Sequence, residues 1–330
     1  MSADGPSGSG AATVALARAA MHTRFELLLH GADPVALRAA GEQALDEIER
    51  LEAQISLYRP TSEIGQVNRH ASERPVLVSP NVFRLLERAA ELSRATGGAF
   101  DPTIAPLVRC WGFMGGEGRR PATDAIALAR GQVGIEGVEL DSAKFTVRFR
   151  RPGMMLDLGA IGKGCAIDAA VDLLREAGIE SAFIHGGTSS SYGLGFPPDA
   201  PAWKAAIPEP PDSTPPGTTC VRRGVPPSGH SPNLLGEVAL TDLSLGVSGI
   251  WSKSFREGGR TFGHVIDPRL GEPVQRACLA AVVLPCAAET DALSTALLVL
   301  GIEGLGVISR LRPNARFLLA GKAMGSHLNS

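Results

Sequence analysis

Residues 288–296 read Ala288-Glu289-Thr290-Asp291-Ala292-Leu293-Ser294-Thr295-Ala296, and this stretch opens an apolar helix that we expect to end at Gly301. Asp291 and Thr295 are four residues apart, so on a helix they lie on one face. A carboxylate and a hydroxyl at that spacing offer the oxygen ligands that Mg²⁺ prefers. The same spacing is common on solvated helix edges, so the pattern alone fits a metal site or a plain polar edge.

The segments around this helix predict an α+β fold. A short strand is expected directly before it, at residues 279–284, and another at residues 23–30. Asp33 and Pro34 favour a helix start, and apolar residues at helical spacing carry that helix to about Ser56. Strands and helices are mixed along the chain without regular βαβ alternation, which favours α+β over α/β.

Composition excludes several classes of function. The chain has 330 residues, enough for one large domain or two interlocked ones, and a formal net charge of -2. We therefore expect no nucleic-acid partner. No stretch of eighteen uncharged apolar residues occurs, so we expect no transmembrane segment. The five cysteines form no C-x-x-C pair, which argues against a zinc ribbon or a disulfide framework.

The ends of the chain and one internal stretch are expected to lie outside the folded core. Residues 1–20 are rich in Gly, Ser and Ala and lack the pattern of a secretory signal, so we expect a disordered tail and a cytoplasmic location. Residues 208–232 are dense in Pro, Ser, Thr and Gly and read as an exposed insertion. The folded domain is predicted to span residues 21–320, followed by a tail at 321–330.

A glycine-rich segment, Gly159-Ala160-Ile161-Gly162-Lys163-Gly164, lies between an expected strand and an expected helix. Small residues let the backbone approach a ligand, and free amides at a helix start attract phosphate oxygens. The order differs from that of a Walker A loop. The segment therefore fits either a phosphate site, with Lys163 as its cation, or a tight turn with a surface lysine.

Two further features have a chemical and an ordinary interpretation. His264 precedes Asp267-Pro268-Arg269, and an imidazole there could take a proton from a hydroxyl, or could simply be hydrogen-bonded on a sheet face. Tyr58 and Phe100 stand out in a chain with few aromatic residues. They could stack on a flat heterocycle or pack in the core.

Taken in order, these segments resemble the ApbE-like family, the FAD:protein FMN transferases. The resemblance runs from about Met21 to Leu319. It rests on the following pieces: Met21-His22-Thr23, Ser62-Glu63-Ile64 with Asn68, Gly97-Gly98-Ala99-Phe100-Asp101-Pro102-Thr103, Trp111-Gly112-Phe113, Asp157-Leu158-Gly159-Ala160-Ile161-Gly162-Lys163-Gly164 with Asp168, Gly186-Gly187, Ser248-Gly249, His264-Val265-Ile266-Asp267-Pro268-Arg269-Leu270-Gly271, and Thr290-Asp291-Ala292-Leu293-Ser294-Thr295-Ala296.

The resemblance implies a two-lobed architecture of mixed, mainly antiparallel sheets with flanking helices. It also implies Mg²⁺-dependent transfer of FMN from FAD, as substrate, to a Thr or Ser hydroxyl in a flavinylation motif of an acceptor protein, with release of AMP. Asp291 and Thr295 match the metal-binding side chains and Ala160 the metal-binding carbonyl, with His264 and Asp291 as catalytic residues. The positions that line the FAD site match Met21, Tyr58, Ala99, Phe100, Asp101 and Lys163.

The chain departs from the family pattern in places. His22 stands where glycine is usual, Leu270 replaces a threonine, and Thr188 follows the double glycine in place of Asp or Asn. Two alternatives therefore stay open beside protein flavinylation. One is a Mg²⁺-dependent FAD pyrophosphatase that gives FMN and AMP, and the other is an FAD-binding protein without turnover.

Overall fold

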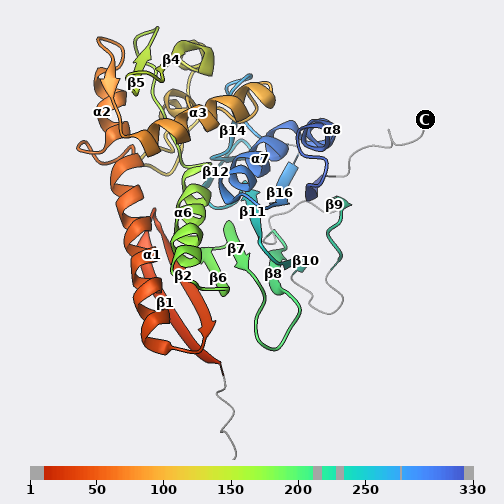
Figure 1. The fold of residues 1–330 in the computed structure, drawn as a ribbon. Coiled ribbons are helices and arrows are strands. Elements are labelled where there is room, and N and C mark those ends of the chain that lie inside the picture. Colours follow the sequence, from red (N-terminus) through yellow and green to blue (C-terminus); the bar gives the residue numbers. More distant parts are fainter. Residues whose placement is uncertain (1–10, 211–217, 228–233, 276, 323–330) are drawn as a thin grey trace, which may run out of the picture.

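The computed structural model describes residues 11–210, 218–227, 234–275 and 277–322, and it is built around one eight-stranded sheet (Figure 1). In order across the sheet, the strands are β1 (Ala12–Ala20), β2 (Thr23–Gly31), β6 (Ser181–Gly186), β7 (Ser190–Leu194), β11 (Leu243–Gly249), β16 (Ala277–Leu284), β17 (Arg316–Lys322) and β9 (Thr218–Arg223). Each neighbouring pair is antiparallel.

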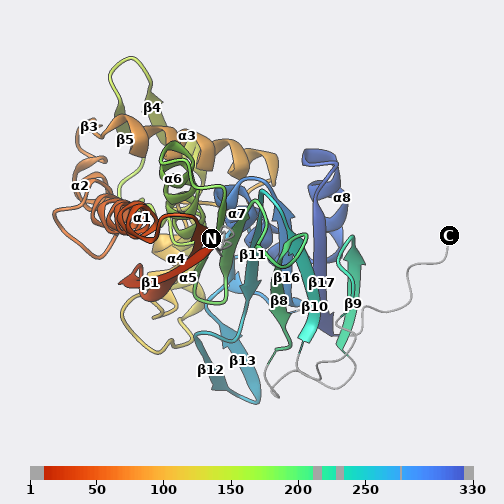
Figure 2. The ribbon, with the colours of Figure 1, turned by 60° about the horizontal axis from the view of Figure 1, so that its bottom comes forward.

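Three helices cover one face of this sheet: α1 (Pro34–Ile55), α6 (Gly162–Glu176) and α7 (Ala287–Leu300) (Figures 1 and 2). Helix α1 begins as its sequence predicts. The Asp33 side chain accepts hydrogen bonds from the amides of Val35 and Ala36, and Pro34 occupies the first turn. Its apolar residues at helical spacing are buried against the sheet and α6.

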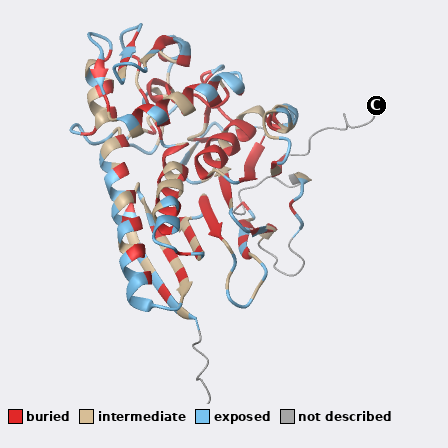
Figure 3. Cartoon of the chain, in the orientation of Figure 1, coloured by how far each residue is buried: buried red, intermediate tan, exposed pale blue. Residues whose placement is uncertain are grey.

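Strand β16 forms the centre of the core, and all eight of its residues are buried (Figure 3). Successive side chains point to opposite faces of the sheet. Ala280 and Val282 contact the apolar cluster that includes α7, whereas Ala281 and Val283 contact a second cluster on the other face. That second face is covered by the ladder of β8 (Trp203–Pro208) with β10 (Leu234–Leu240). Helix α7 is thus fixed against the most buried strand of the molecule.

The remaining elements form a smaller lobe and the connections to it (Figure 1). The smaller lobe holds α2 (Glu63–His70), β3 (Val76–Leu77), α3 (Pro80–Ala95), α4 (Ala105–Cys110), α5 (Thr123–Arg130), the short 3-10 turn η1 (Ile135–Gly137), β4 (Val138–Asp141) and β5 (Thr146–Phe149). The hairpins β12 (Ser254–Glu257) with β13 (Arg260–Gly263) and β14 (Ile266–Asp267) with β15 (Glu272–Pro273), together with α8 (Ile302–Leu311), complete the fold. The expected α+β fold with mainly antiparallel sheets is confirmed.

The expected boundaries of the folded domain need correction at three places. Residues 12–20, expected to be disordered, form β1, which pairs with β2 along its whole length and buries Val14 and Ala20. The stretch 208–232, expected to be an insertion without structure, contains β9, which pairs with β17. Strand β17 reaches Lys322, inside the expected C-terminal tail. Residues 1–10, 211–217, 228–233 and 323–330 lie outside the described residues.

Within the described ranges, no helix combines the length and the apolar character needed to cross a bilayer.

Candidate functional site

A cavity of about 440 Å³ is lined by segments from both lobes. The smaller lobe contributes residues of the 99–104 loop and Val108 of α4, and the segment from Asp157 to Lys163 contributes the glycine loop and the start of α6. The end of β11, the residues on either side of the β12–β13 hairpin and the N-terminal half of α7 complete the wall. The glycine loop, His264 and the Asp291–Thr295 helix, proposed separately from the sequence, therefore reach one cavity.

Asp291 is buried in the first half of α7, and the residue is 6% exposed. Its two carboxylate oxygens accept hydrogen bonds from the Ser190 hydroxyl at 2.6 Å and from the Gly164 amide at 2.7 Å. Burial raises the pKa of Asp291, while the nearby Lys163 ammonium opposes that shift. A buried carboxylate held by only two neutral donors is stabilised when a cation faces it.

Thr295 lies one helical turn after Asp291 and also lines the cavity. Its hydroxyl donates to the Asp291 carbonyl at 3.2 Å and lies 3.0 Å from the Ser248 hydroxyl of β11. The Ser294 hydroxyl lies 2.8 Å from the same Ser248 oxygen. These contacts orient the Thr295 oxygen, as a neutral ligand to a metal would require.

Ala160 lines the same cavity. It lies just before α6, in which the Cys165 amide donates to the Ile161 carbonyl at 3.0 Å. The Gly164 amide belongs to the first turn, which has no intrahelical acceptor for it, and donates to Asp291. The Ala160 carbonyl would add a third oxygen. Together with Asp291 and Thr295 this gives one carboxylate and two neutral oxygens. Such a set suits Mg²⁺, which binds few protein ligands and keeps water or phosphate oxygens in its shell.

His264 follows β13 directly and is half-buried in the cavity wall. Its amide donates to the Lys253 carbonyl at 3.0 Å, which fixes the backbone at this point. Burial lowers the pKa of the His264 imidazole, and the Lys253 and Lys163 ammonium groups lower it further. The ring is therefore neutral at neutral pH and able to accept a proton.

Lys163 and Asp157 line the large cavity and a smaller adjoining pocket of about 110 Å³. Lys163 is in the first turn of α6, with its ammonium group 3.5 Å from the Gly159 carbonyl oxygen. One Asp157 carboxylate oxygen accepts the Gly159 amide at 2.8 Å, which holds the glycine loop in place. A mobile cation beside a helix N-terminus is suited to neutralise phosphate oxygens.

The residues predicted to line the nucleotide site divide between the two spaces. Tyr58, Ala99, Phe100 and Asp101 line the larger cavity, whereas Met21 lines only the smaller pocket. The Asp101 carboxylate is turned toward its own loop, where it accepts the Thr103 amide at 2.8 Å and the Thr103 hydroxyl at 2.6 Å. Asp101 therefore shapes the cavity wall by holding the 99–103 loop.

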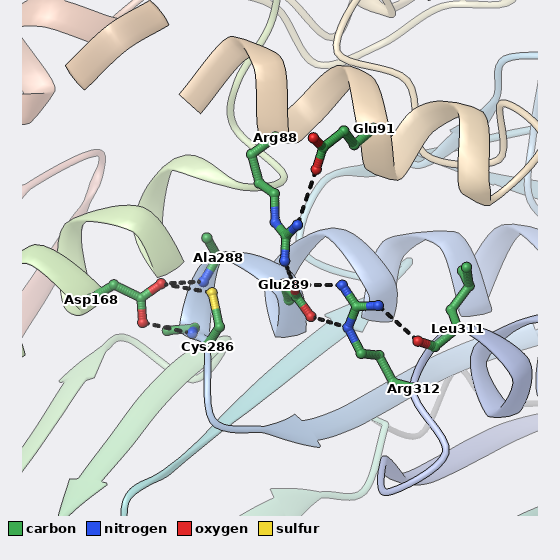
Figure 4. Close-up of polar contacts among 9 residues, drawn as sticks. Arg88, Glu91, Asp168, Cys286, Ala288, Glu289, Leu311 and Arg312 are labelled. Atoms are coloured by element: carbon green, nitrogen blue, oxygen red, sulfur yellow. Dashed lines mark hydrogen bonds and ion pairs between the residues drawn. The ribbon is translucent and has the colours of Figure 1, made fainter. Parts of the chain in front are cut away.

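Charged side chains of other helices fix the N-terminus of α7 (Figure 4). Asp168 of α6 accepts hydrogen bonds from the Ala287 amide at 2.7 Å and the Ala288 amide at 2.9 Å. It thereby replaces the N-cap that Cys286 does not provide. Glu289 is buried and forms ion pairs with Arg312, at 2.6 Å, and with Arg88 of α3.

The structure also adds residues that the sequence did not single out as parts of the site. They are Ser190, Ser248, Asp157, Lys253 and Trp251. Ser190 lies in a Thr-Ser-Ser-Ser run that fits a polar turn, but it begins β7. Asp157 and Ser248 stand within the quoted family segments, and that membership was the available signal. No group of three or more His, Cys, Asp or Glu suited to a metal occurs among the described residues.

Sequence comparison places these residues in a known context. The profile of the ApbE family matches residues 21–319. The FAD:protein FMN transferase of Haemophilus influenzae is 30% identical over 281 residues, which cover 82% of this chain and 76% of that relative. The protein of the same name from Vibrio cholerae is 30% identical over 277 residues, with 82% and 75% covered.

Solved structures agree with the sequence comparison. The ApbE protein of Thermotoga maritima shares the fold, with a TM-score of 0.80 and 23% identity over 93% of this chain and 94% of that one. The flavin transferase ApbE of Vibrio cholerae gives a TM-score of 0.75 and 25% identity, covering 95% of this chain and 98% of that one. By sequence and by fold, this chain belongs to the ApbE family.

Proposed function

We propose that this protein transfers the FMN half of FAD to a Thr or Ser hydroxyl of an acceptor protein, in a Mg²⁺-dependent reaction that releases AMP. One observation carries the proposal. Asp291, Thr295, Ala160, Lys163 and His264 come from three separate stretches of the chain and line one cavity of about 440 Å³. The FAD:protein FMN transferases to which the chain is similar support the same activity.

Each group has a part in phosphoryl-type transfer. The Asp291 carboxylate, the Thr295 hydroxyl and the Ala160 carbonyl would hold Mg²⁺, which withdraws charge from the pyrophosphate when bound. Lys163 adds a positive charge on the side of the α6 N-terminus. The fixed positions of these groups mean that little reorganisation is needed as charge develops on the phosphate oxygens.

His264 provides the base. Its neutral imidazole accepts the proton of the acceptor hydroxyl as that oxygen attacks the phosphorus atom of the FMN phosphate. A new P–O bond to the acceptor forms, the P–O bond to the AMP portion breaks, and AMP leaves with the bridging oxygen. Burial, together with the charges of Lys253 and Lys163, lowers the pKa of His264 and keeps the base in its active, neutral form at neutral pH.

The test is incubation of the purified protein with FAD and Mg²⁺, with and without peptides that carry one central Thr or Ser between randomised neighbours. Covalent flavin on peptide, detected by fluorescence and mass, together with equimolar AMP supports the proposal, and EDTA should abolish both. AMP release at the same rate without peptide would assign water as the acceptor. Binding of FAD with neither product would remove the enzymatic function altogether.

A further inference from the structure

The turn between β1 and β2 has an unusual sequence for its backbone. Ala20 pairs with Thr23, so Met21 and His22 alone form a two-residue hairpin loop, with φ of 51° and 60°. Such turns favour Asn-Gly because both residues need positive φ. An Asn-Gly turn would meet the same geometry with less strain. The geometry of the turn therefore does not explain why methionine and histidine occupy these two positions.

Packing in the core accounts for the methionine at position 21 but not for the histidine at position 22. Met21 packs against two apolar clusters of the core. His22 is exposed, and its ring lies 5.4 Å from the Tyr58 ring at an interplanar angle of 54°. Both rings line the pocket of about 110 Å³. Backbone strain that persists beside a pocket points to a role of the strained residue in that pocket.

The composition of this pocket indicates what it binds. Tyr58, Asp157, Gly159 and Lys163 line both the pocket and the large cavity, so the two spaces share a rim. The pocket also has apolar walls from Ile55, Leu57 and Leu158. Aromatic rings, an apolar wall, one carboxylate and one ammonium group together suit a planar nitrogen heterocycle with both hydrogen-bond donors and acceptors.

We propose that His22 contacts the substrate: one ring system of FAD packs in the smaller pocket against the rings of His22 and Tyr58, which are tilted by 54° and so meet it as one face and one edge. The identity of the ligand rests on the proposed function. The remainder of the dinucleotide then extends past Asp157 and Lys163 into the large cavity, where Asp291 lies. His22 thereby favours the binding of a substrate that carries a heterocycle at this end, compared with a shorter pyrophosphate that lacks one.

The decisive variant is His22→Gly, because glycine accepts the positive φ and removes only the ring. We expect its melting temperature to stay close to that of the wild type. We expect the Kd for FAD, measured in EDTA by flavin fluorescence, to rise about tenfold, as loss of one stacking contact predicts. His22→Phe keeps a ring and should retain most of the affinity.

Phe145→Gly is the matched control. Phe145 also has positive φ, 51°, and its ring packs against Phe83 on the smaller lobe, away from both spaces. We expect the FAD affinity of this variant to equal that of the wild type. Wild-type or tighter FAD binding by His22→Gly would overturn the inference, as would an equal loss in Phe145→Gly.

AMP release and peptide labelling, measured on the same preparations in Mg²⁺, separate this inference from the proposed function. If the wild type labels peptide and His22→Gly binds FAD normally, only the role of His22 is wrong. If FAD binding depends on His22 but the wild type yields neither AMP nor labelled peptide, only the proposed function is wrong.

Discussion

Gly164 shows how a single residue sets the distance between two helices at the site. A Cβ atom at this position would lie 2.0 Å from the Ala287 carbonyl oxygen. That oxygen is a backbone atom, so it cannot rotate aside as the end of a side chain could. The absence of a side chain lets α6 approach the first turn of α7. At that distance the Gly164 amide reaches the Asp291 carboxylate.

The variant Gly164→Ala should therefore lose stability and activity together. Forcing the two backbones apart costs about 1–3 kcal/mol, in the range of other overpacked sites. Thermal denaturation should show a melting temperature a few degrees lower, and FAD turnover should fall by more than the loss of folded protein explains. Gly178→Ala is the control for stability, since its Cβ would have no neighbour within 4 Å and only the positive φ of 75° is strained. Normal turnover by Gly164→Ala would contradict this account of the α6–α7 contact.

The lowered pKa of His264 predicts how the activity depends on pH. Its folded-state pKa is lowered from the ordinary 6.5, so the base is deprotonated at neutral pH and gains a proton only as the pH falls below that value. A plot of kcat/KM against pH should show an acid limb below 6.5 and a plateau above it. Lys253→Ala should move the limb to higher pH, because one of the charges that lowers this pKa is removed. An acid limb in His264→Asn identical to that of the wild type would assign the proton transfer to another group.

Helix α7 depends on contacts with distant parts of the chain. Asp168 of α6 caps its first amides, and Glu289 connects it to Arg88 of α3 and to Arg312 after α8 (Figure 4). The contacts of both carboxylates fall in the first turn of α7, just before Asp291. The helix that carries Asp291 and Thr295 is therefore held from three directions.

Asp168→Asn should lower the free energy of unfolding by about 1–3 kcal/mol. The two carboxylate oxygens of Asp168 each accept one backbone N–H group, whereas an asparagine side chain has one acceptor oxygen and leaves one of these N–H groups without a partner. It should also reduce kcat for FAD cleavage while the Kd for FAD in EDTA stays near the wild-type value, since Asp168 does not line the cavity. Glu136→Gln is the control, because the Arg94–Glu136 pair is exposed, with 51% and 76% of the side chains accessible. Equal stability of the two variants, measured in urea, would show that the cap contributes nothing.

Local signals in the sequence identify some elements and miss others. Helix α1 was predicted within a residue or so at both ends because Asp33, Pro34 and the apolar spacing are all local. Strand β1 was missed because its alanine-rich sequence has no propensity for a strand, and its pairing with β2 and cover by α1 supply the stability instead. Strand β9 was missed for a similar reason, since β17, its strand partner among the described residues, lies about a hundred residues away.

At the scale of the whole molecule, the site arises from long-range contacts. The partners of Asp291 are Gly164, which is 127 residues away, and Ser190, which is 101 residues away. The residues of the glycine loop, His264 and α7 could be proposed from the sequence one by one. Their convergence on one cavity followed only from resemblance to a family, because no local pattern encodes it. Ser190, which contacts Asp291, lies in a polar run that fits an ordinary turn, and Ser248, which contacts Thr295, was marked only by its place in a family segment.

The central claim is that the residues lining this cavity bind Mg²⁺ and catalyse the transfer of FMN from FAD. It is tested most directly by measuring AMP release and covalent flavin against Mg²⁺ concentration for the wild type and for Asp291→Ala, with circular dichroism to confirm that both are folded. The account predicts that the wild type responds to Mg²⁺ and that folded Asp291→Ala shows a loss of turnover of at least about a hundredfold, the scale of losing a catalytic electrostatic contact. Mg²⁺-dependent turnover at the wild-type rate in Asp291→Ala would contradict it.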